Sequence, residues 1–162
     1  PKNMNFLDLN ILDKFIEDIN IAGSIFSKAN KVLCYHNHAL EFQKINNEII
    51  LERIYNNTDN KYIQGEPDVY WIQKGGHDPI SWCKKLKNRL PLIHLKDFIM
   101  LNEHESYYAE IGNGNLDIKN IIKEAELSGC KWYIVEQDEC QGDPFNSIEI
   151  SFNNLLEFVS NP

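Results

Sequence analysis

The sequence predicts an α/β fold in which parallel strands alternate with helices. Along the chain, four short apolar runs alternate with segments whose apolar residues recur at steps of three and four. The order is one helix followed by four strand–helix pairs, which is typical of a parallel sheet with helices on its outside. The composition, 43% hydrophobic and 25% charged residues over 162 positions, is that of a globular domain with one core.

The individual elements follow from these runs and from the residues that begin and end helices. The apolar runs predict strands over residues 31–36, 62–65, 90–95 and 131–136. The helical spacing predicts helices over residues 6–29, 48–55, 79–86, 118–127 and 147–159. Asp78 before Pro79 is a favourable helix start, and Asp117 can cap the next helix, which Gly129 is placed to end. Residues 96–116 are predicted to form a long loop, and loops of more than about 12–15 residues are usually functional.

Four candidate metal ligands stand near the ends of the four apolar runs: Glu41, Asp68, His94 and Glu136. The steps between them are 27, 26 and 42 residues, whereas a strand–helix unit of a (β/α)8 barrel takes about 30. One ligand per unit, at the carboxyl end of each strand, would bring all four ligands to the same end of the barrel. Such an oxygen-rich set suits Mn²⁺ or Mg²⁺ better than a thiolate zinc site would. Glu66, two residues before Asp68, competes with Glu41 for its place in the set.

The charge and the cysteine content exclude several classes of protein. The net charge is −8 and basic residues occur only in short clusters, so nucleic-acid binding is not expected. The four cysteines form no C-x-x-C pair; buried free thiols are the ordinary interpretation for three of them, and Cys140, in a polar run, is expected to be exposed. No apolar run approaches the about 18 residues of a membrane span, so we expect no membrane partner and a cytoplasmic location.

Five short strings carry a resemblance to a known family. They are residues 35–42 (YHNHALEF), 76–79 (GHDP), 94–97 (HLKD), 110–114 (EIGNG) and 135–138 (VEQD). In this order they resemble the sugar phosphate isomerase/epimerase family, which belongs to the xylose isomerase-like TIM barrels. The resemblance extends over nearly the whole chain and is specific for the superfamily rather than for a substrate.

The resemblance implies an enzyme that binds a divalent metal ion, Mn²⁺, Mg²⁺, Co²⁺ or Zn²⁺. Carried onto this sequence, the family's ligands are Glu41, Asp68, His94 and Glu136. The implied reaction is the isomerisation or epimerisation of a sugar, sugar phosphate or related compound by proton transfer beside a metal-bound carbonyl. Glu41 and Glu136 would be the catalytic acid and base.

The chain is shorter than a complete barrel of this family. A (β/α)8 barrel takes about 250 residues, and this chain has 162. The strings match the last four strands, so we expect residues 1–162 to form a single xylose isomerase-like domain without its N-terminal half, a half or incomplete TIM barrel. Four strands leave two open edges, which invite pairing. The expected partner is therefore a second copy of the chain, in a homo-oligomer, or a missing half.

Four residues are candidates for substrate binding. His38 shares a strand face with His36, and we expect both to point into the pocket. Lys96 shares a face with His94 and could contact substrate or phosphate, and Trp71 could stack on a sugar ring. Glu110 precedes the glycine turn of residues 112–114. Each also has a structural interpretation: a packed histidine, an ion pair with Glu136, a core tryptophan and a tight turn.

Other functions would use many of the same residues and the same fold. A cyclitol dehydratase of the inosose type cannot be separated from an isomerase on sequence, and a non-catalytic half-barrel remnant stays open. A nuclease of the endonuclease IV type shares the barrel, but it would need a multi-zinc cluster with more histidines and a basic face. The five histidines and the charge of −8 argue against it.

Overall fold

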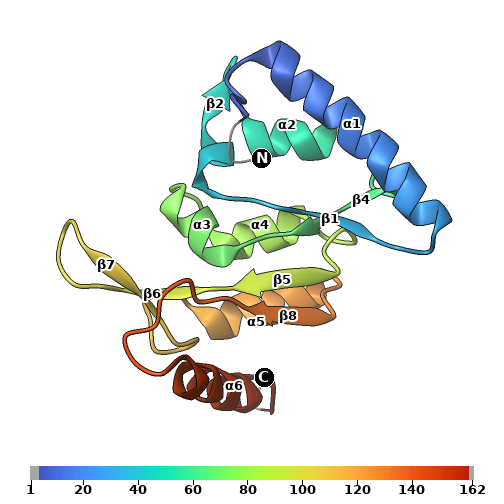
Figure 1. Cartoon of the computed structure of the whole chain (residues 1–162). Helices are drawn as coiled ribbons and strands as arrows, with labels where there is room; N and C mark the ends of the chain where they lie inside the picture. Colours follow the sequence, from blue (N-terminus) through green and yellow to red (C-terminus); the bar gives the residue numbers. More distant parts are fainter. Residues whose placement is uncertain (1–3, 161–162) are drawn as a thin grey trace.

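The computed structural model describes residues 4–160, in which helices and strands alternate (Figure 1). The helices are α1 (Leu9–Lys28), α2 (Ile50–Asn56), α3 (Val69–Lys74), α4 (Pro79–Lys85), α5 (Ile118–Leu127) and α6 (Pro144–Ser160), and η1 (Ala39–Phe42) is a 3-10 turn. The strands are β1 (Leu33–His36), β2 (Lys44–Ile45), β3 (Glu48–Ile49), β4 (Ile63–Glu66), β5 (Leu92–Leu95), β6 (Asp97–Met100), β7 (Ser106–Ala109) and β8 (Trp132–Val135).

Four short parallel strands position the site. β1 pairs with β4, and β5 pairs with β8. A parallel bridge between Asp68 and His94 joins the two pairs, and there the His94 N–H donates to the carbonyl of Pro67 over 3.0 Å. The strand order is therefore β1-β4-β5-β8, and the carboxyl ends of the strands lie on the left in Figure 1.

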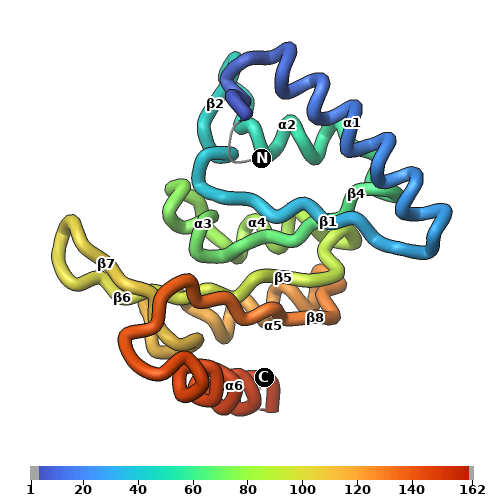
Figure 2. The backbone as a smooth tube through the Cα atoms, viewed as in Figure 1, coloured from blue at the N-terminus to red at the C-terminus, as the bar shows by residue number. Residues whose placement is uncertain are grey.

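The prediction of parallel strands within an α/β fold is confirmed. Within residues 4–160 the strands do not close into a barrel, because β1 and β8 each pair on one side only. The hairpin of β6 and β7 projects from the same end of the sheet as the carboxyl ends of the strands (Figure 2).

Aspartates begin five of the described helices. The side chains of Asp8, Asp68, Asp78, Asp117 and Asp143 accept backbone N–H groups at the starts of α1, α3, α4, α5 and α6. A carboxylate there satisfies an N–H that has no partner inside the helix, and its charge complements the helix dipole. The predicted caps Asp78 and Asp117 are confirmed.

One apolar core lies between the strands and the helices. Leu12 of α1, Ile54 of α2, Ile63 of β4 and Ile121 of α5 are all buried in it. Gly23 allows α1 to lie close to β4, because a Cβ atom at this position would be 2.7 Å from the carbonyl oxygen of Tyr62.

Three local features differ from the sequence-based expectation. The helix expected from residue 48 begins at Ile50, because Glu48–Ile49 pairs with Lys44–Ile45 in a small hairpin. The loop expected over residues 96–116 contains the antiparallel hairpin of β6 and β7. α3 was not expected, because a helix of this length has too few apolar residues to show a periodic pattern.

The cysteines differ in how far they are buried. All four cysteines are free thiols; Cys83 and Cys130 are buried, and Cys34 and Cys140 are partly buried. Burial raises the pKa of the Cys83 thiol to about 12, which makes it unreactive. Over the part of the chain that the structure describes, no helix is long and apolar enough to span a bilayer.

Candidate metal centre and substrate pocket

Four side chains converge at the carboxyl ends of the four parallel strands. His36, Asp68, His94 and Glu136 each offer one ligand atom, and these atoms all lie within 4.8 Å of one another. His36 is the last residue of β1, Asp68 follows the end of β4, His94 lies in β5, and Glu136 follows β8. Parallel strands bring their carboxyl ends to one edge, so residues from four distant positions in the sequence meet here.

The buried carboxylate of Asp68 makes this group of side chains suited to bind a cation. Asp68 is 0% exposed. Its Oδ1 accepts the backbone N–H of Trp71 over 3.1 Å, whereas its Oδ2 is buried without a hydrogen-bond partner. Nε2 of His36 lies 3.7 Å from Oδ2. Burial raises the pKa of Asp68 to about 7, because a charged carboxylate is unfavourable away from water. A cation beside Oδ2 would remove that cost.

His94 lies between two carboxylates. Its Nδ1 is 2.6 Å from Oε2 of Glu136, and its Nε2 is 2.7 Å from Oε1 of Glu66. Burial by itself lowers the pKa of His94, but the hydrogen bonds with Glu66 and Glu136 outweigh it, so the pKa lies above its usual value. The two carboxylates thus stabilise a positive charge on His94, at the centre of the group.

Lys96 is a buried cation next to the group. It is 1% exposed, and its Nζ donates to Oδ2 of Asp138 over 2.8 Å and to Oε1 of Glu136 over 3.3 Å. Its Nζ also lies 5.2–5.8 Å from the ring centroids of Tyr70, Trp71 and Tyr108. Burial lowers the pKa of Lys96, but the hydrogen bond with Asp138 and the neighbouring carboxylates raise it above its usual value, so Lys96 stays charged.

Glu41 lies outside the group of four. It is buried in η1, where its Oε1 accepts the hydroxyl of Tyr35 over 2.9 Å and its Oε2 accepts the backbone N–H of His38 over 3.0 Å. The structure therefore brings together three of the four predicted ligands, Asp68, His94 and Glu136, and places His36 rather than Glu41 beside them. The physical reason is position, because Glu41 follows the end of β1 by five residues and its carboxylate closes a turn.

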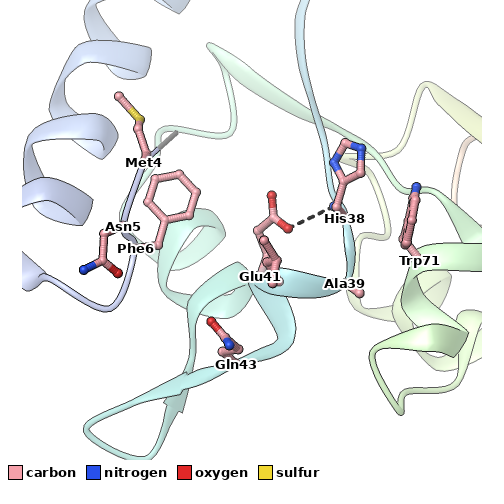
Figure 3. A pocket seen from close by; sticks show the side chains of 9 residues that line it. Met4, Asn5, Phe6, His38, Ala39, Glu41, Gln43 and Trp71 are labelled. Atoms are coloured by element: carbon pink, nitrogen blue, oxygen red, sulfur yellow. Dashed lines mark hydrogen bonds between the residues drawn. The ribbon is translucent and has the colours of Figure 1, made fainter. Parts of the chain in front are cut away.

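A pocket of about 440 Å³ contains three of the predicted site residues. It is lined by Met4, Asn5, Phe6, His38, Ala39, Leu40, Glu41, Gln43 and Trp71. In Figure 3 the carboxylate of Glu41 lies between the ring of Phe6 and the ring of His38, and Trp71 lies beyond His38. The ring of His38 is centred 5.2 Å from that of Trp71 and 5.0 Å from that of His36, so the pocket adjoins the candidate metal group.

Glu110, the remaining predicted residue, is not among the residues that line this pocket. Its Oε1 accepts the hydroxyl of Ser147 over 2.8 Å, which ties the segment after β7 to the start of α6. This hydrogen bond holds the pKa of Glu110 below its usual value. The structure therefore gives Glu110 a bracing contact.

Two residues of the site, His36 and Asp138, were not among the sequence-based candidates for these roles, whereas Glu66, which was expected to compete with Glu41 for the ligand set, contacts His94. His36 ends an apolar run just as the ligand candidates do, so its position was a usable signal for a ligand. Glu66 and Asp138 lie two residues from Asp68 and Glu136, and only the structure shows that they contact His94 and Lys96.

The comparisons with known proteins give a consistent result. No family model matches the chain. A sugar phosphate isomerase/epimerase from Parabacteroides distasonis is 31% identical with a TM-score of 0.78, over 90% of this chain and 52% of that chain. The predicted resemblance to sugar phosphate isomerases/epimerases is confirmed. Other structural neighbours are xylose isomerase-like proteins.

Two further relatives of this chain are enzymes by name. The 3-keto-D-glucoside 4-epimerase of E. coli is 15% identical with a TM-score of 0.69, over 91% of this chain and 54% of that chain, which shows the shared fold. An inosose dehydratase from Geobacillus thermodenitrificans is 25% identical over 150 residues, which are 82% of this chain and 50% of the dehydratase. The chain thus spans about half the length of the relatives it matches.

Proposed function

We propose that this chain is the metal-binding part of an enzyme that isomerises or epimerises a sugar or a sugar derivative by proton transfer. The observation that carries the proposal is the convergence of His36, Asp68, His94 and Glu136 within 4.8 Å, with Oδ2 of Asp68 buried and without a hydrogen-bond partner. The relatives named as isomerases and epimerases support this class of reaction.

The same four residues would hold the cation. Two imidazole nitrogens and two carboxylate oxygens suit Mn²⁺, Mg²⁺, Co²⁺ or Zn²⁺. When bound, the ion supplies a Lewis acid that polarises a carbonyl group of the substrate. We propose His36 as a ligand in place of Glu41.

Glu41 and Glu136 are the proposed acid and base. Glu41 faces the pocket, and Tyr35 and the backbone of His38 fix the position of its carboxylate. Glu136 is held by Nδ1 of His94 and Nζ of Lys96, and these contacts keep the pKa of Glu136 below its usual value although burial raises it. An oriented, ionised carboxylate can accept a proton from a substrate carbon, and the second glutamate, as the carboxylic acid, can donate its own proton to the substrate.

The pocket residues would bind the substrate. The indole of Trp71 offers a face on which a sugar ring can stack, and the imidazole of His38 can hydrogen bond to a hydroxyl group. We propose a positioning role for Lys96, since its ammonium is buried against Glu136 and Asp138. Glu110 is left out of the proposed site because it binds Ser147.

Dehydration of a cyclitol is the second candidate. The relative named inosose dehydratase favours it, and the same base and acid would remove a proton and expel a hydroxyl group. A half barrel that binds metal without turnover, the non-catalytic remnant, is the third candidate.

We also propose that the four parallel strands are half of a TIM barrel. A partner would then complete the sheet. Trp132 of β8 is 69% exposed, and Tyr133, Val135, Phe152 and Leu156 line an apolar groove between β8 and α6. A second copy of the chain, or the other half of a barrel, would cover this surface. Sedimentation velocity at several protein concentrations separates a homo-oligomer from a monomer that needs another chain.

Solvent exchange tests the proposed reaction without knowledge of the product. Keto sugars and inososes are incubated with the protein in D₂O, with Mn²⁺ or with EDTA, and analysed by mass spectrometry and NMR. We expect deuterium to enter at a carbon next to the carbonyl, only with metal present, in an assembly that contains any required partner. Loss of a hydroxyl group in the same assay would favour the dehydratase. Metal binding without exchange in any compound would favour the remnant.

A further inference from the structure

We infer that Glu66 is a positioning residue of the candidate metal site: its carboxylate accepts the Nε2–H of His94 and so directs the other ring nitrogen, Nδ1, to the cation. This role rests on the proposed metal site and adds to it an acceptor that is not itself a ligand. Glu66 was expected from the sequence to compete for a place among the ligands, and its contacts give it a different role.

Glu66 lies beside His94 at the end of β4. It is the last residue of this strand, and its Cα atom is paired in register with that of His36 at the end of β1. The carbonyl of Pro67, the next residue, accepts the backbone N–H of His94 over 3.0 Å. The paired backbones of neighbouring strands therefore place the carboxylate of Glu66 next to the imidazole of His94.

The carboxylate of Glu66 contacts His94 but lies outside the group of four. Its Oε1 is 2.7 Å from Nε2 of His94, which is the length of a strong hydrogen bond to a charged acceptor. The side chains of Glu66 and His94 are 22% and 15% exposed, so the contact is largely shielded from water. The ligand atoms that lie within 4.8 Å of one another come from His36, Asp68, His94 and Glu136. Glu66 is therefore placed to hold a ligand rather than to be one.

The two ring nitrogens of His94 face different partners. Nδ1 lies 2.6 Å from Oε2 of Glu136, which is another member of the group, whereas Nε2 faces Glu66. A neutral imidazole has one N–H and one nitrogen with a free lone pair, and the lone pair binds a metal ion. Since Nδ1 faces the group, it is the nitrogen that binds the ion, and the proton belongs on Nε2, where Glu66 accepts it. Histidine ligands commonly donate the N–H of their second nitrogen to a carboxylate, which fixes the ring and makes it more basic.

Two other members of the group are held in the same manner. Oδ1 of Asp68 accepts the backbone N–H of Trp71 over 3.1 Å, and its Oδ2 is buried without a hydrogen-bond partner. Oε1 of Glu136 accepts a hydrogen bond from Nζ of Lys96 over 3.3 Å, and its Oε2 faces His94. Each of these side chains has one atom held from outside the group and one atom directed toward the group. The hydrogen bond inferred for His94 extends this pattern to three of the four residues.

A neighbouring ring restricts the imidazole of His94 but does not orient it. The ring centroids of His36 and His94 are 4.3 Å apart, and the ring planes are inclined at 77°. This packing limits the tilt of the ring, yet it fits equally a ring turned over about the Cβ–Cγ bond. A turned ring would present C–H groups at the places of both nitrogens, so the hydrogen bonds with Glu66 and Glu136 select the orientation. Loss of Glu66 removes one of the two.

Zn²⁺ affinity tests the role of Glu66 without any assay of turnover. The wild type and the variants are titrated with Zn²⁺ in competition with a chromophoric chelator. Glu66→Ala should lose about 10–100-fold in affinity, the loss typical of a hydrogen-bond partner of a metal ligand. Glu66→Gln should lose less, because its amide oxygen still accepts the N–H of Nε2. Gln64→Ala is the control and should bind Zn²⁺ as the wild type does, since Gln64 lies two residues earlier on the same face of β4 and its amide donates to the carbonyl of Asn60.

Nitrogen NMR shows which ring nitrogen of His94 binds the ion. The protein is labelled with ¹⁵N-histidine and loaded with Zn²⁺, and the signals of His94 are assigned by comparison with His94→Gln. We expect Nε2 to carry a proton that exchanges slowly with water and Nδ1 to carry none. In Glu66→Ala that proton should exchange faster, because its acceptor is gone.

Each contrary result has a different meaning. A proton on Nδ1 of His94 in the loaded wild type, or a Glu66→Ala variant that binds Zn²⁺ as tightly as the wild type, would overturn the inference. A loss in Glu66→Gln as large as that in Glu66→Ala would make Glu66 a ligand and would overturn it too. A wild type that binds no Zn²⁺ would refute the metal site and the inference with it. Zn²⁺ binding with the expected nitrogen signals, but without solvent exchange in any sugar, would refute the proposed reaction alone.

Discussion

The side-chain oxygen of Asn37 accepts the backbone N–H of Asp68 over 3.2 Å and so ties the end of β1 to the start of α3. Asn37 is 0% exposed. It lies directly after His36, and Asp68 is the N-cap of α3. The hydrogen bond therefore fixes the positions of two proposed metal ligands, His36 and Asp68, relative to each other.

Asn37→Leu should destabilise the fold and weaken metal binding together. The substitution leaves the N–H of Asp68 without its acceptor, which costs about 1–3 kcal/mol in a buried position. Chemical denaturation gives the free energy of unfolding, and calorimetry gives the Mn²⁺ affinity. Asn153→Leu, on the exposed side of α6, is the control and should change neither. Unchanged Mn²⁺ affinity in Asn37→Leu would show that the bond does not position the ligands.

Gly23→Ala tests the close packing of α1 on β4. The new Cβ atom would be 2.7 Å from the carbonyl oxygen of Tyr62 and 2.8 Å from Cδ1 of Ile63. Overpacking of this kind typically costs about 1–3 kcal/mol. Gly142→Ala is the matched control, because nothing lies within 4 Å of its added Cβ atom. Equal unfolding free energies for the two variants would contradict the described packing.

Lys96→Met should destabilise the protein more than Lys84→Met. Lys96 is buried between Glu136 and Asp138, whereas Lys84 has a side chain that is 64% exposed and pairs with Glu124 at 3.7 Å. Loss of a hydrogen bond to a charged group costs about 1.5–3 kcal/mol, and an exposed pair contributes about 0–1 kcal/mol. Thermal and chemical denaturation at one pH provide the comparison. If Lys84→Met proves as damaging as Lys96→Met, the buried pairing contributes little.

Much of the fold could be predicted from the sequence, because it depends on local patterns. The four apolar runs predicted the parallel strands. Asp78 and Asp117 predicted the starts of two helices, since capping depends only on neighbouring residues. α3 and the hairpin of β6 and β7 could not be predicted in this way. A six-residue helix shows no period, and the hairpin pairs residues of a segment whose pattern is mostly polar.

The site could be predicted in part. Asp68, His94 and Glu136 were found because they stand at the ends of apolar runs, and they do meet. The place of His36 beside the other three residues, with Glu41 outside the group, required the structure, because it depends on where β1 ends and on a turn that holds Glu41. The contacts of Lys96 with Asp138 also required it, since they join residues 42 positions apart.

Glu136→Gln should reduce both metal binding and turnover. A neutral amide is a poorer partner for a hard cation than a carboxylate. Loss of a positioned acid or base reduces turnover by about 10²–10⁴-fold, and excess metal should not restore it. Glu139→Gln, an exposed residue of the same loop, is the control. Full recovery of Glu136→Gln at saturating metal would leave Glu136 a ligand only and would move proton transfer to Glu41.

Mn²⁺ binding by His36→Ala and by Glu41→Gln tests the central claim most directly. The wild type and both variants are titrated with Mn²⁺, and free Mn²⁺ is followed by electron paramagnetic resonance. If His36, Asp68, His94 and Glu136 hold the ion, His36→Ala should lose more than about 10-fold in affinity, the lower end of the loss typical of outer-shell partners. Glu41→Gln should then bind Mn²⁺ nearly as tightly as the wild type. Strong loss in Glu41→Gln with little change in His36→Ala would contradict the account.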